Sequence, residues 1–260
     1  KFFLSHFKLF GLSNRKNSQL YNRAIMQSGI SINPWAFQPN PLREATMLAQ
    51  RLGIVWSNTA DLVAQLRNVP PMTLVENQGG WLELPVPRGY TSFEWVPNVE
   101  PENSPEYRFL TADPVTLMNR GQILTMPFII GTTSVESLFM TREPFLTGDD
   151  TVPAQFEANP HFYASPTFNL VPGVHTSEIN EVAMAMRNYY FNGGHVSNEA
   201  GVARFNYSSY MSDHHFAYGV DRTIRYHARR QSQPIYYYQF GYDGSLNMIK
   251  RLLLLTEYPG

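Results

Sequence analysis

Pro127-Phe128-Ile129-Ile130-Gly131 is an unbroken apolar run between two residues that interrupt regular structure. Such a run, without alternation of polar and apolar residues, predicts a strand that is buried on both faces. A second run of this kind spans residues 235–240 (IYYYQF) and follows Pro234, a residue that is tolerated at the start of a strand. We therefore expect two buried strands.

Helical patterns surround the two predicted strands. The helix at 41–52 has proline in its first turn and Gly53 after its end, and Asp113 precedes Pro114 as an N-cap. The predicted helices span residues 41–52, 60–67, 114–121, 177–191 and 213–230, the last with Asp213 as its cap. The proline-rich residues 85–105 are predicted to form loops. Helices between short, non-alternating strands predict an α/β fold with a mostly parallel sheet and helices on both faces.

The composition excludes several classes of protein. Of the 260 residues, 43% are hydrophobic and only 16% are charged, which is unlike a disordered chain or a coiled coil. With 20 basic and 21 acidic residues, there is no excess of positive charge for a nucleic-acid backbone. No apolar stretch reaches the roughly 18 residues of a membrane span. The absence of cysteine excludes disulfides, thiolate metal sites and a cysteine nucleophile.

Short motifs with a known chemistry are few. Neither the glycine-rich loops that bind nucleotides nor a Gly-x-Ser-x-Gly nucleophile motif occurs, and no cofactor is expected. His214 and His215 follow Asp213, but adjacent positions of a helix point about 100° apart, so we predict no metal site there. Asn206-Tyr207-Ser208 is an N-glycosylation sequon, a pattern that also arises by chance.

Several longer segments, in this order, resemble the type-B carboxylesterases, the family that includes the cholinesterases. The resemblance spans about residues 12–260. It is carried by residues 23–29 (RAIMQSG), 34–36 (PWA), 93–100 (FEWVPNVE), 109–114 (FLTADP), 127–131 (PFIIG), 212–216 (SDHHF), 234–240 (PIYYYQF) and 242–244 (YDG). The arginine-rich residues 221–230 and the pattern Leu246-Asn247-x-x-Lys250 look most like the insect alpha-type esterases.

This resemblance implies an α/β-hydrolase fold and a Ser-Glu-His triad. The chain would be one partial domain, residues 1–260, that lacks the N-terminal strands. The triad acid would be Glu136, in the segment GTTSVES that begins at Gly131. From the residues alone, Glu136 is a surface glutamate that opens a helix. The family has glycine where Ser137 stands, and glycine tolerates backbone conformations that serine does not.

The resemblance also assigns weaker roles and places two triad members elsewhere. Ser28 matches a serine that supports the triad, although it also reads as a turn residue before Gly29. Trp35 matches an aromatic residue of the acyl pocket, or it packs in the core. The nucleophilic serine is expected at or just before Lys1 and the catalytic histidine beyond Gly260, so we expect both ends to be interior points of a longer protein.

Three functions follow from these observations. The first is a carboxylic ester hydrolase that acts on a small-molecule ester through an acyl-enzyme; the second is an inactive esterase-fold module for binding or adhesion; the third is a truncated product without function. Ile54 and Gln65 stand where secreted relatives often have a disulfide, which favours the cytoplasm here. The sequon argues for secretion, so the localisation stays open, as does the oligomeric state.

Overall fold

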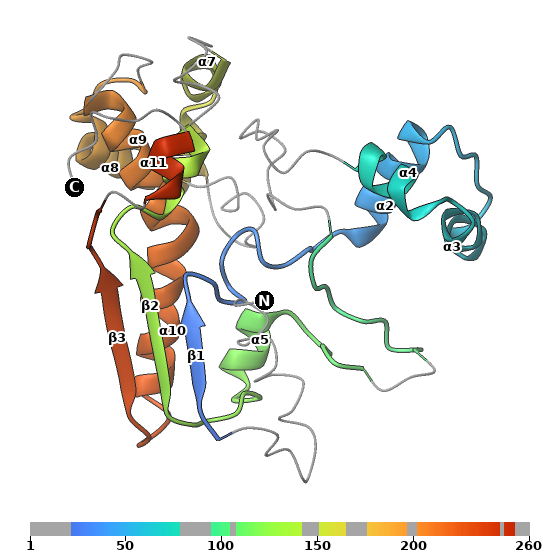
Figure 1. Cartoon of the computed structure of the whole chain (residues 1–260), viewed down its shortest axis with the longest axis horizontal. Coiled ribbons are helices and arrows are strands. Elements are labelled where there is room, and N and C mark those ends of the chain that lie inside the picture. The colour runs from blue at the N-terminus through green and yellow to red at the C-terminus, as the bar shows by residue number, and fades with distance from the viewer. Residues whose placement is uncertain are drawn as a thin grey trace.

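The centre of the protein is a parallel sheet of three strands. The computed structural model describes residues 22–78, 95–104, 108–141, 151–164, 176–196, 202–244 and 247–252. Strands β1 (Ala24–Gln27), β2 (Phe128–Thr133) and β3 (Ile235–Phe240) lie side by side in that order, and both pairs are parallel (Figure 1). The predicted parallel sheet is confirmed, and β2 and β3 are the two apolar runs.

Strand β1 was not predicted, because a segment of four residues is too short to show a pattern of apolar residues that is typical of a strand. Its register with β2 sets Ile25 opposite Ile129 and Gln27 opposite Gly131. Of its four residues only Met26 is buried. Pairing with β2, which lies more than 100 residues away in the chain, makes this segment a strand.

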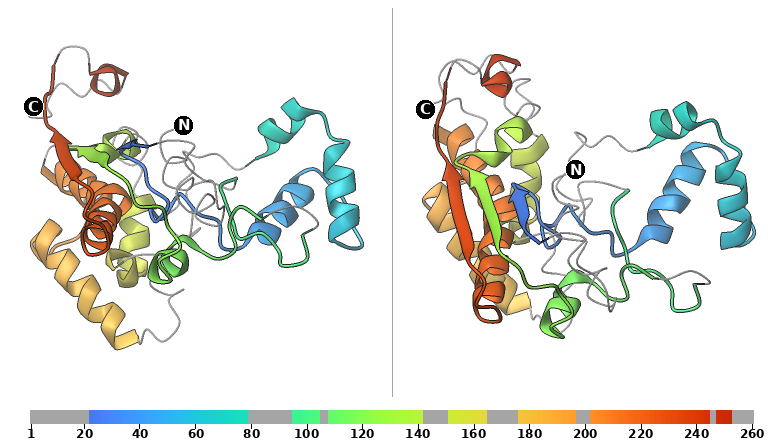
Figure 2. Two further views of the ribbon diagram at one scale, coloured as in Figure 1. Left: turned by 90° about the horizontal axis from the view of Figure 1, so that it is seen from below. Right: turned by 60° about the horizontal axis from the view of Figure 1, so that its bottom comes forward.

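The prediction that the strands are buried on both faces is wrong for the described residues. One face packs on helix α10 (Tyr218–Ala228), where Met26, Ile130 and Val220 share one apolar core. Figure 2 shows α10 on this side of the sheet. On the other face, Ile129 is 39% exposed and its neighbour in the register, Tyr236, is 60% exposed. An apolar run indicates that a strand can be buried on both faces, but other segments have to supply the cover.

The predicted helices at the start of the chain are confirmed. Helix α2 (Pro41–Arg51) begins after Asn40, whose side chain accepts from the Arg43 amide, and the chain leaves it through Gly53 at φ +68°. Helix α5 (Pro114–Asn119) is capped by Asp113, which accepts from the Thr116 amide at 2.9 Å. Local caps therefore fix these helices: the Asp113 cap and the glycine after α2 were predicted, whereas the Asn40 cap was not.

Helices α3 (Thr59–Arg67) and α4 (Pro71–Asn77) form a group with α2 that extends away from the sheet (Figures 1 and 2). Helix α4 was missed, because the two prolines at 70 and 71 were expected only to end the preceding helix. Helix α3 ends at Arg67, before both prolines, and Pro71 occupies the first position of α4, where its missing N–H costs nothing.

Gln65, one of the two positions where the resemblance implies a disulfide in relatives, is hydrogen-bonded to Val55, the neighbour of the other position, Ile54. Gln65 on α3 donates from Nε2 to the carbonyl of Val55, 2.8 Å away, and to Asp61 Oδ1. The loop after α2 is thus fastened to α3 without a covalent bond.

A second apolar core, distinct from the one between the sheet and α10, is rich in aromatic residues. It is built from α7 (Thr151–Ala158), the 3₁₀ turn η3 (Pro160–Tyr163), α8 (Thr176–Phe191) and α9 (Val202–Ser212). The rings of Phe156 and Tyr163 meet edge to face with centroids 4.8 Å apart. The helix predicted at 177–191 is confirmed as α8, and its Ile179 and Ala183 are buried in this core.

The helix predicted to begin at Asp213 in fact begins earlier. Helix α9 continues through a π turn, η5 (Asp213–Ala217), directly into α10. Ser212 has helical φ and ψ of −64° and −46°, so Asp213 lies inside a continuous helix and does not cap it. Its carboxylate instead accepts a hydrogen bond from the hydroxyl of Tyr190 on α8, at 2.5 Å. The Asp213 side chain thus bonds to Tyr190 on another helix, whereas the local sequence pattern predicted that it would cap its own helix.

The remaining elements are the 3₁₀ turn η2 (Glu136–Thr141) after β2 and helix α11 (Met248–Leu252) after β3. Throughout the described part of the chain, no helix has both the length and the apolar character needed to cross a bilayer.

Gly131, at the middle of β2, allows β3 to approach closely. A Cβ atom at this position would lie 2.4 Å from the ring of Tyr238 and 2.5 Å from its backbone carbonyl. We therefore predict that Gly131→Ala lowers the free energy of unfolding by about 2 kcal/mol, because the strands must separate. Urea denaturation measures this, with Gly241→Ala as the control, since a Cβ there meets nothing within 4 Å. Equal midpoints for the two variants would contradict the close approach.

Buried histidines on the continuous helix predict a loss of stability in acid. Burial, followed by the neighbouring His214, lowers the pKa of His215 to about 3, and burial also lowers the pKa of His227. In the unfolded chain, histidine binds a proton below about pH 6.5. The unfolded state therefore takes up protons first, so stability is full above pH 6.5 and falls as the pH drops toward 3.

In this window His215 contributes a slope that approaches about 1.4 kcal/mol per pH unit. Urea titrations at pH 7, 6 and 5 measure the slope, which is expected to be smaller in His215→Gln. A wild-type free energy of unfolding that is constant between pH 7 and pH 5 would contradict the neutral, buried state of these rings.

Candidate active site

Glu136 and Ser28 lie at the same edge of the sheet. Glu136 is the first residue of η2 and follows the end of β2 by three residues, whereas Ser28 directly follows β1. Because β1 and β2 are parallel, their carboxyl ends meet at one edge, the arrowheads of Figure 1. In open α/β sheets this edge is where ligands bind.

The carboxylate of Glu136 is held through one of its two oxygens. Oε1 accepts a hydrogen bond from Ser28 Oγ at 2.5 Å and another from the backbone amide of Thr133 at 2.6 Å. Within the described residues, Oε2 has no hydrogen-bond partner. The carboxylate is therefore fixed in orientation and still offers one oxygen as an acceptor.

Ser28 adopts a backbone conformation that turns its hydroxyl toward Glu136. Its amide donates to the Gly131 carbonyl at 2.9 Å and so extends the β1–β2 pairing by one residue. Its φ of +55° then places it in the left-handed region, which serine seldom adopts. Ser28 is thus a turn residue that also contacts Glu136. The two interpretations of Ser28, as a turn residue and as a partner of the triad acid, are therefore compatible with each other. Its role in catalysis stays a prediction.

Ser137 fits the turn without strain, although a glycine was expected there. Its φ and ψ are −93° and 19°, and this negative φ does not require glycine. Its amide donates to the hydroxyl of Ser212, 2.9 Å away at the end of α9. Sequence patterns did not find Ser212, because its partner lies 75 residues away and the neighbouring Asp213 was interpreted as a helix start.

Trp35 lies in the core next to the π turn η5. It is 9% exposed, its indole N–H donates to the carbonyl of His215 at 3.0 Å, and its ring packs against Phe216 with centroids 5.5 Å apart. These contacts are those of a core residue, and the acyl-pocket role implied by the resemblance stays a prediction.

The sequon residue Asn206 lies within helix α9, not on a loop. Ser208, the third residue of the sequon, is fully buried, and its carbonyl accepts from Ser212. Glycosylation acceptors belong on accessible surface loops, so this placement does not favour modification of Asn206.

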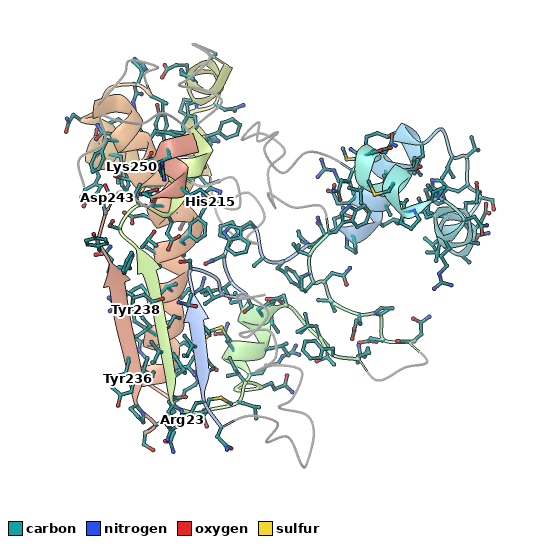
Figure 3. The ribbon with its side chains drawn as sticks, viewed as in Figure 1. Arg23, His215, Tyr236, Tyr238, Asp243 and Lys250 are labelled. Carbon is teal, nitrogen blue, oxygen red and sulfur yellow. The ribbon has the colours of Figure 1, made fainter. Side chains whose placement is uncertain are left out.

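The segment after β3 is fastened at the same edge of the sheet. Asp243 accepts from Asn247 Nδ2 at 3.0 Å and forms an ion pair with Lys250 on α11, the two side chains being mostly buried (Figure 3). The bond from Lys250, and then that from Asn247, lowers the pKa of Asp243. This contact joins Asp243, three residues after β3, to helix α11. The described residues contain no group of three or more His, Cys, Asp or Glu that could hold a metal ion.

The three-stranded parallel sheet with helices packed on it is part of an α/β-hydrolase fold. The crystal structure of juvenile hormone esterase from Manduca sexta, with OTFP covalently attached, has the same fold, with a TM-score of 0.72 and 24% identity. The match covers 97% of this chain and 44% of that one. This chain belongs to the carboxylesterase family, whose sequence profile matches residues 7–254.

Insect esterases are among its relatives. Venom carboxylesterase-6 of Apis mellifera is 25% identical over 246 residues, which cover 92% of this chain and 42% of the relative. Juvenile hormone esterase of Heliothis virescens is 27% identical over 244 residues, covering 92% of this chain and 40% of the relative. The chain thus spans about two fifths of the length of these curated relatives.

Ser28 combines a strained backbone with a hydrogen bond, and two variants separate these effects. Ser28→Ala and Ser28→Gly both remove the bond to Glu136, which as a bond to a charged group contributes about 1.5–3 kcal/mol. Only glycine adopts φ +55° at little cost. We predict that both variants are less stable than wild type and that Ser28→Gly is more stable than Ser28→Ala by about 1 kcal/mol. Urea denaturation at pH 7 measures both, and equal stabilities would contradict the strained backbone.

Proposed function

We propose that this chain is part of a serine-type carboxylic ester hydrolase in which Glu136 is the acid of the catalytic triad. Membership of the carboxylesterase family supports the reaction class. The observation that carries the assignment is the Glu136 carboxylate, fixed through Oε1 at the carboxyl edge of the sheet with Oε2 left as an acceptor. A carboxylate that is held in this way can orient an imidazole.

In this mechanism the nucleophilic serine attacks the ester carbonyl while a histidine takes its proton. Glu136 Oε2 accepts from the imidazole N–H, holds the ring in the productive tautomer and stabilises its charged form. Ser28 and Thr133 keep the other oxygen from turning away. The acyl-enzyme is then hydrolysed by water along the same path, and the substrate is proposed to be a small-molecule carboxylic ester.

The nucleophile and the base are proposed to come from outside the described residues. The 260 residues contain no Gly-x-Ser-x-Gly motif. The ring nitrogens of His215 and His227 meet Met211 and Gln231, and His195 meets Glu157 and Arg187. These partners are distinct from Glu136, so none of these three histidines is the proposed base.

An inactive module for binding or adhesion is the competing proposal. Such a protein has no use for a carboxylate that is fixed on one oxygen and open on the other at the strand edge. The geometry of Glu136 therefore favours the enzyme.

The test uses the protein expressed from its complete coding sequence, with p-nitrophenyl esters as substrates. Glu136→Gln keeps the size of the side chain but removes its charge, so we predict that kcat falls by about 10³ to 10⁴-fold with little change in KM. Glu76→Gln, an exposed glutamate on α4, is the matched control and is expected to keep wild-type activity. The 260-residue chain by itself is expected to show only the background rate.

Wild-type kcat in Glu136→Gln would remove Glu136 from the triad. A complete protein that neither hydrolyses these esters nor reacts with an organophosphate would favour the binding module.

A further inference from the structure

We propose that Ser212 is a positioning residue for Glu136. Its buried hydroxyl, at the end of helix α9, binds the turn that carries the Glu136 carboxylate and so fixes the position of that turn. This inference rests on the proposed function and adds a residue that acts through Glu136. It begins with the backbone next to the glutamate.

The amide of Ser137 needs a partner that the turn itself cannot supply. Ser137 is the second residue of η2, and the first amides of a helix have no acceptor within it. Because Ser137 is fully buried, its N–H cannot be satisfied at the surface. The Ser212 hydroxyl accepts this hydrogen bond at 2.9 Å and so caps the turn from another part of the fold.

The Ser212 hydroxyl is itself fixed in direction. It is 4% exposed, and it donates its single proton to the carbonyl of Ser208, one turn earlier on α9, at 2.6 Å. The proton therefore points along the helix, and a lone pair of the oxygen points at Ser137. The hydroxyl group joins both contacts, and an alanine at this position would lose them together.

The helix that carries Ser212 is held on its far side by a second contact. Beyond Ser212 the chain enters the π turn, where Trp35 donates to the carbonyl of His215 and packs on Phe216. Ser212 therefore lies on a helix that is held on both sides of the junction between α9 and η5.

Glu136 is thus positioned from three elements. The end of β1 contributes Ser28 and the end of β2 contributes Thr133, both to the carboxylate, while the end of α9 contributes Ser212 to the adjoining peptide. The first two contacts set the direction of Oε1, and the third sets where the main chain of the glutamate lies. Without it the buried Ser137 amide must find another acceptor, and the turn has to move to reach one.

The experiment compares variants in the protein expressed from its complete coding sequence. A displacement of about 1 Å in a catalytic group can cost about 100-fold in rate, so Ser212→Ala is expected to lower kcat by about 10- to 100-fold with KM changed less than about twofold. A misplaced carboxylate also stabilises the charged base less well, so the acid limb of the kcat/KM profile is expected to shift to lower pH. A merely structural serine would leave that limb in place.

Two further variants control for stability and for the hydroxyl. Ser212→Thr retains a hydroxyl that can bond to the carbonyl four residues earlier, so it is expected to restore kcat to within about threefold of wild type. Thr223→Val removes another fully buried hydroxyl, on α10, whose oxygen has no partner. It is expected to leave kcat and the pH profile unchanged.

The outcomes separate this inference from the proposed function. If Glu136→Gln is inactive but Ser212→Ala keeps the kcat and pH profile of wild type, the role of Ser212 is refuted and that of Glu136 stands. An equal loss in Thr223→Val would also refute it, because the effect would then belong to any buried hydroxyl. If Ser212→Ala does not fold, Ser212→Cys, with its weaker hydrogen bonds, takes its place, and wild-type kinetics in that variant would refute the proposal.

Discussion

The parallel pairing of β1 with β2 is the constraint on which the site depends. It sets Gln27 opposite Gly131, and the next amide, that of Ser28, still bonds to the Gly131 carbonyl. Ser28 and Glu136 are 108 residues apart in the chain, and only this register brings them into contact. A shift by one residue would turn every side chain of β1 to the opposite face of the sheet. The hydroxyl of Ser28 would then be directed away from the carboxylate.

Gly131 extends the same constraint to the third strand. Its missing side chain lets Tyr238 lie across β2, and the pairing continues until Ser134 donates to the Phe240 carbonyl at 3.0 Å. The chain therefore leaves β3 beside the turn that carries Glu136. Asp243, three residues after β3, pairs there with Lys250 on α11. One glycine in the middle strand thus helps to bring the ends of all three strands to the candidate site.

Sequence patterns predicted correctly those features of the structure that depend on contacts between residues close in the chain. They failed for features that depend on contacts between distant residues. Asp113 caps its helix as expected, because its partner lies three residues away. Asp213 does not, because Tyr190 on another helix binds its carboxylate. Strand β1 exists through its pairing, so four residues with one buried side chain could not reveal it. The exposure of Tyr236 likewise depends on what covers the sheet and not on the apolar run itself. The same holds for the candidate site. The family resemblance indicated Glu136, whereas the hydrogen bond between Ser212 and the Ser137 amide joins residues that are distant in the chain and is seen only in the structure.

The hydrogen bonds around Glu136 distinguish it from an ordinary surface glutamate at the start of a helix. A free glutamate rotates about three bonds, and orienting it during a reaction would cost conformational entropy. Here two donors converge on Oε1, and one of them, Ser28, holds a backbone conformation that serine disfavours. Strain of this kind persists only where the surrounding structure enforces it. The conformational entropy of the Glu136 side chain is therefore already lost when the protein folds. A carboxylate that is oriented before the reaction can hold an imidazole in place while a proton moves.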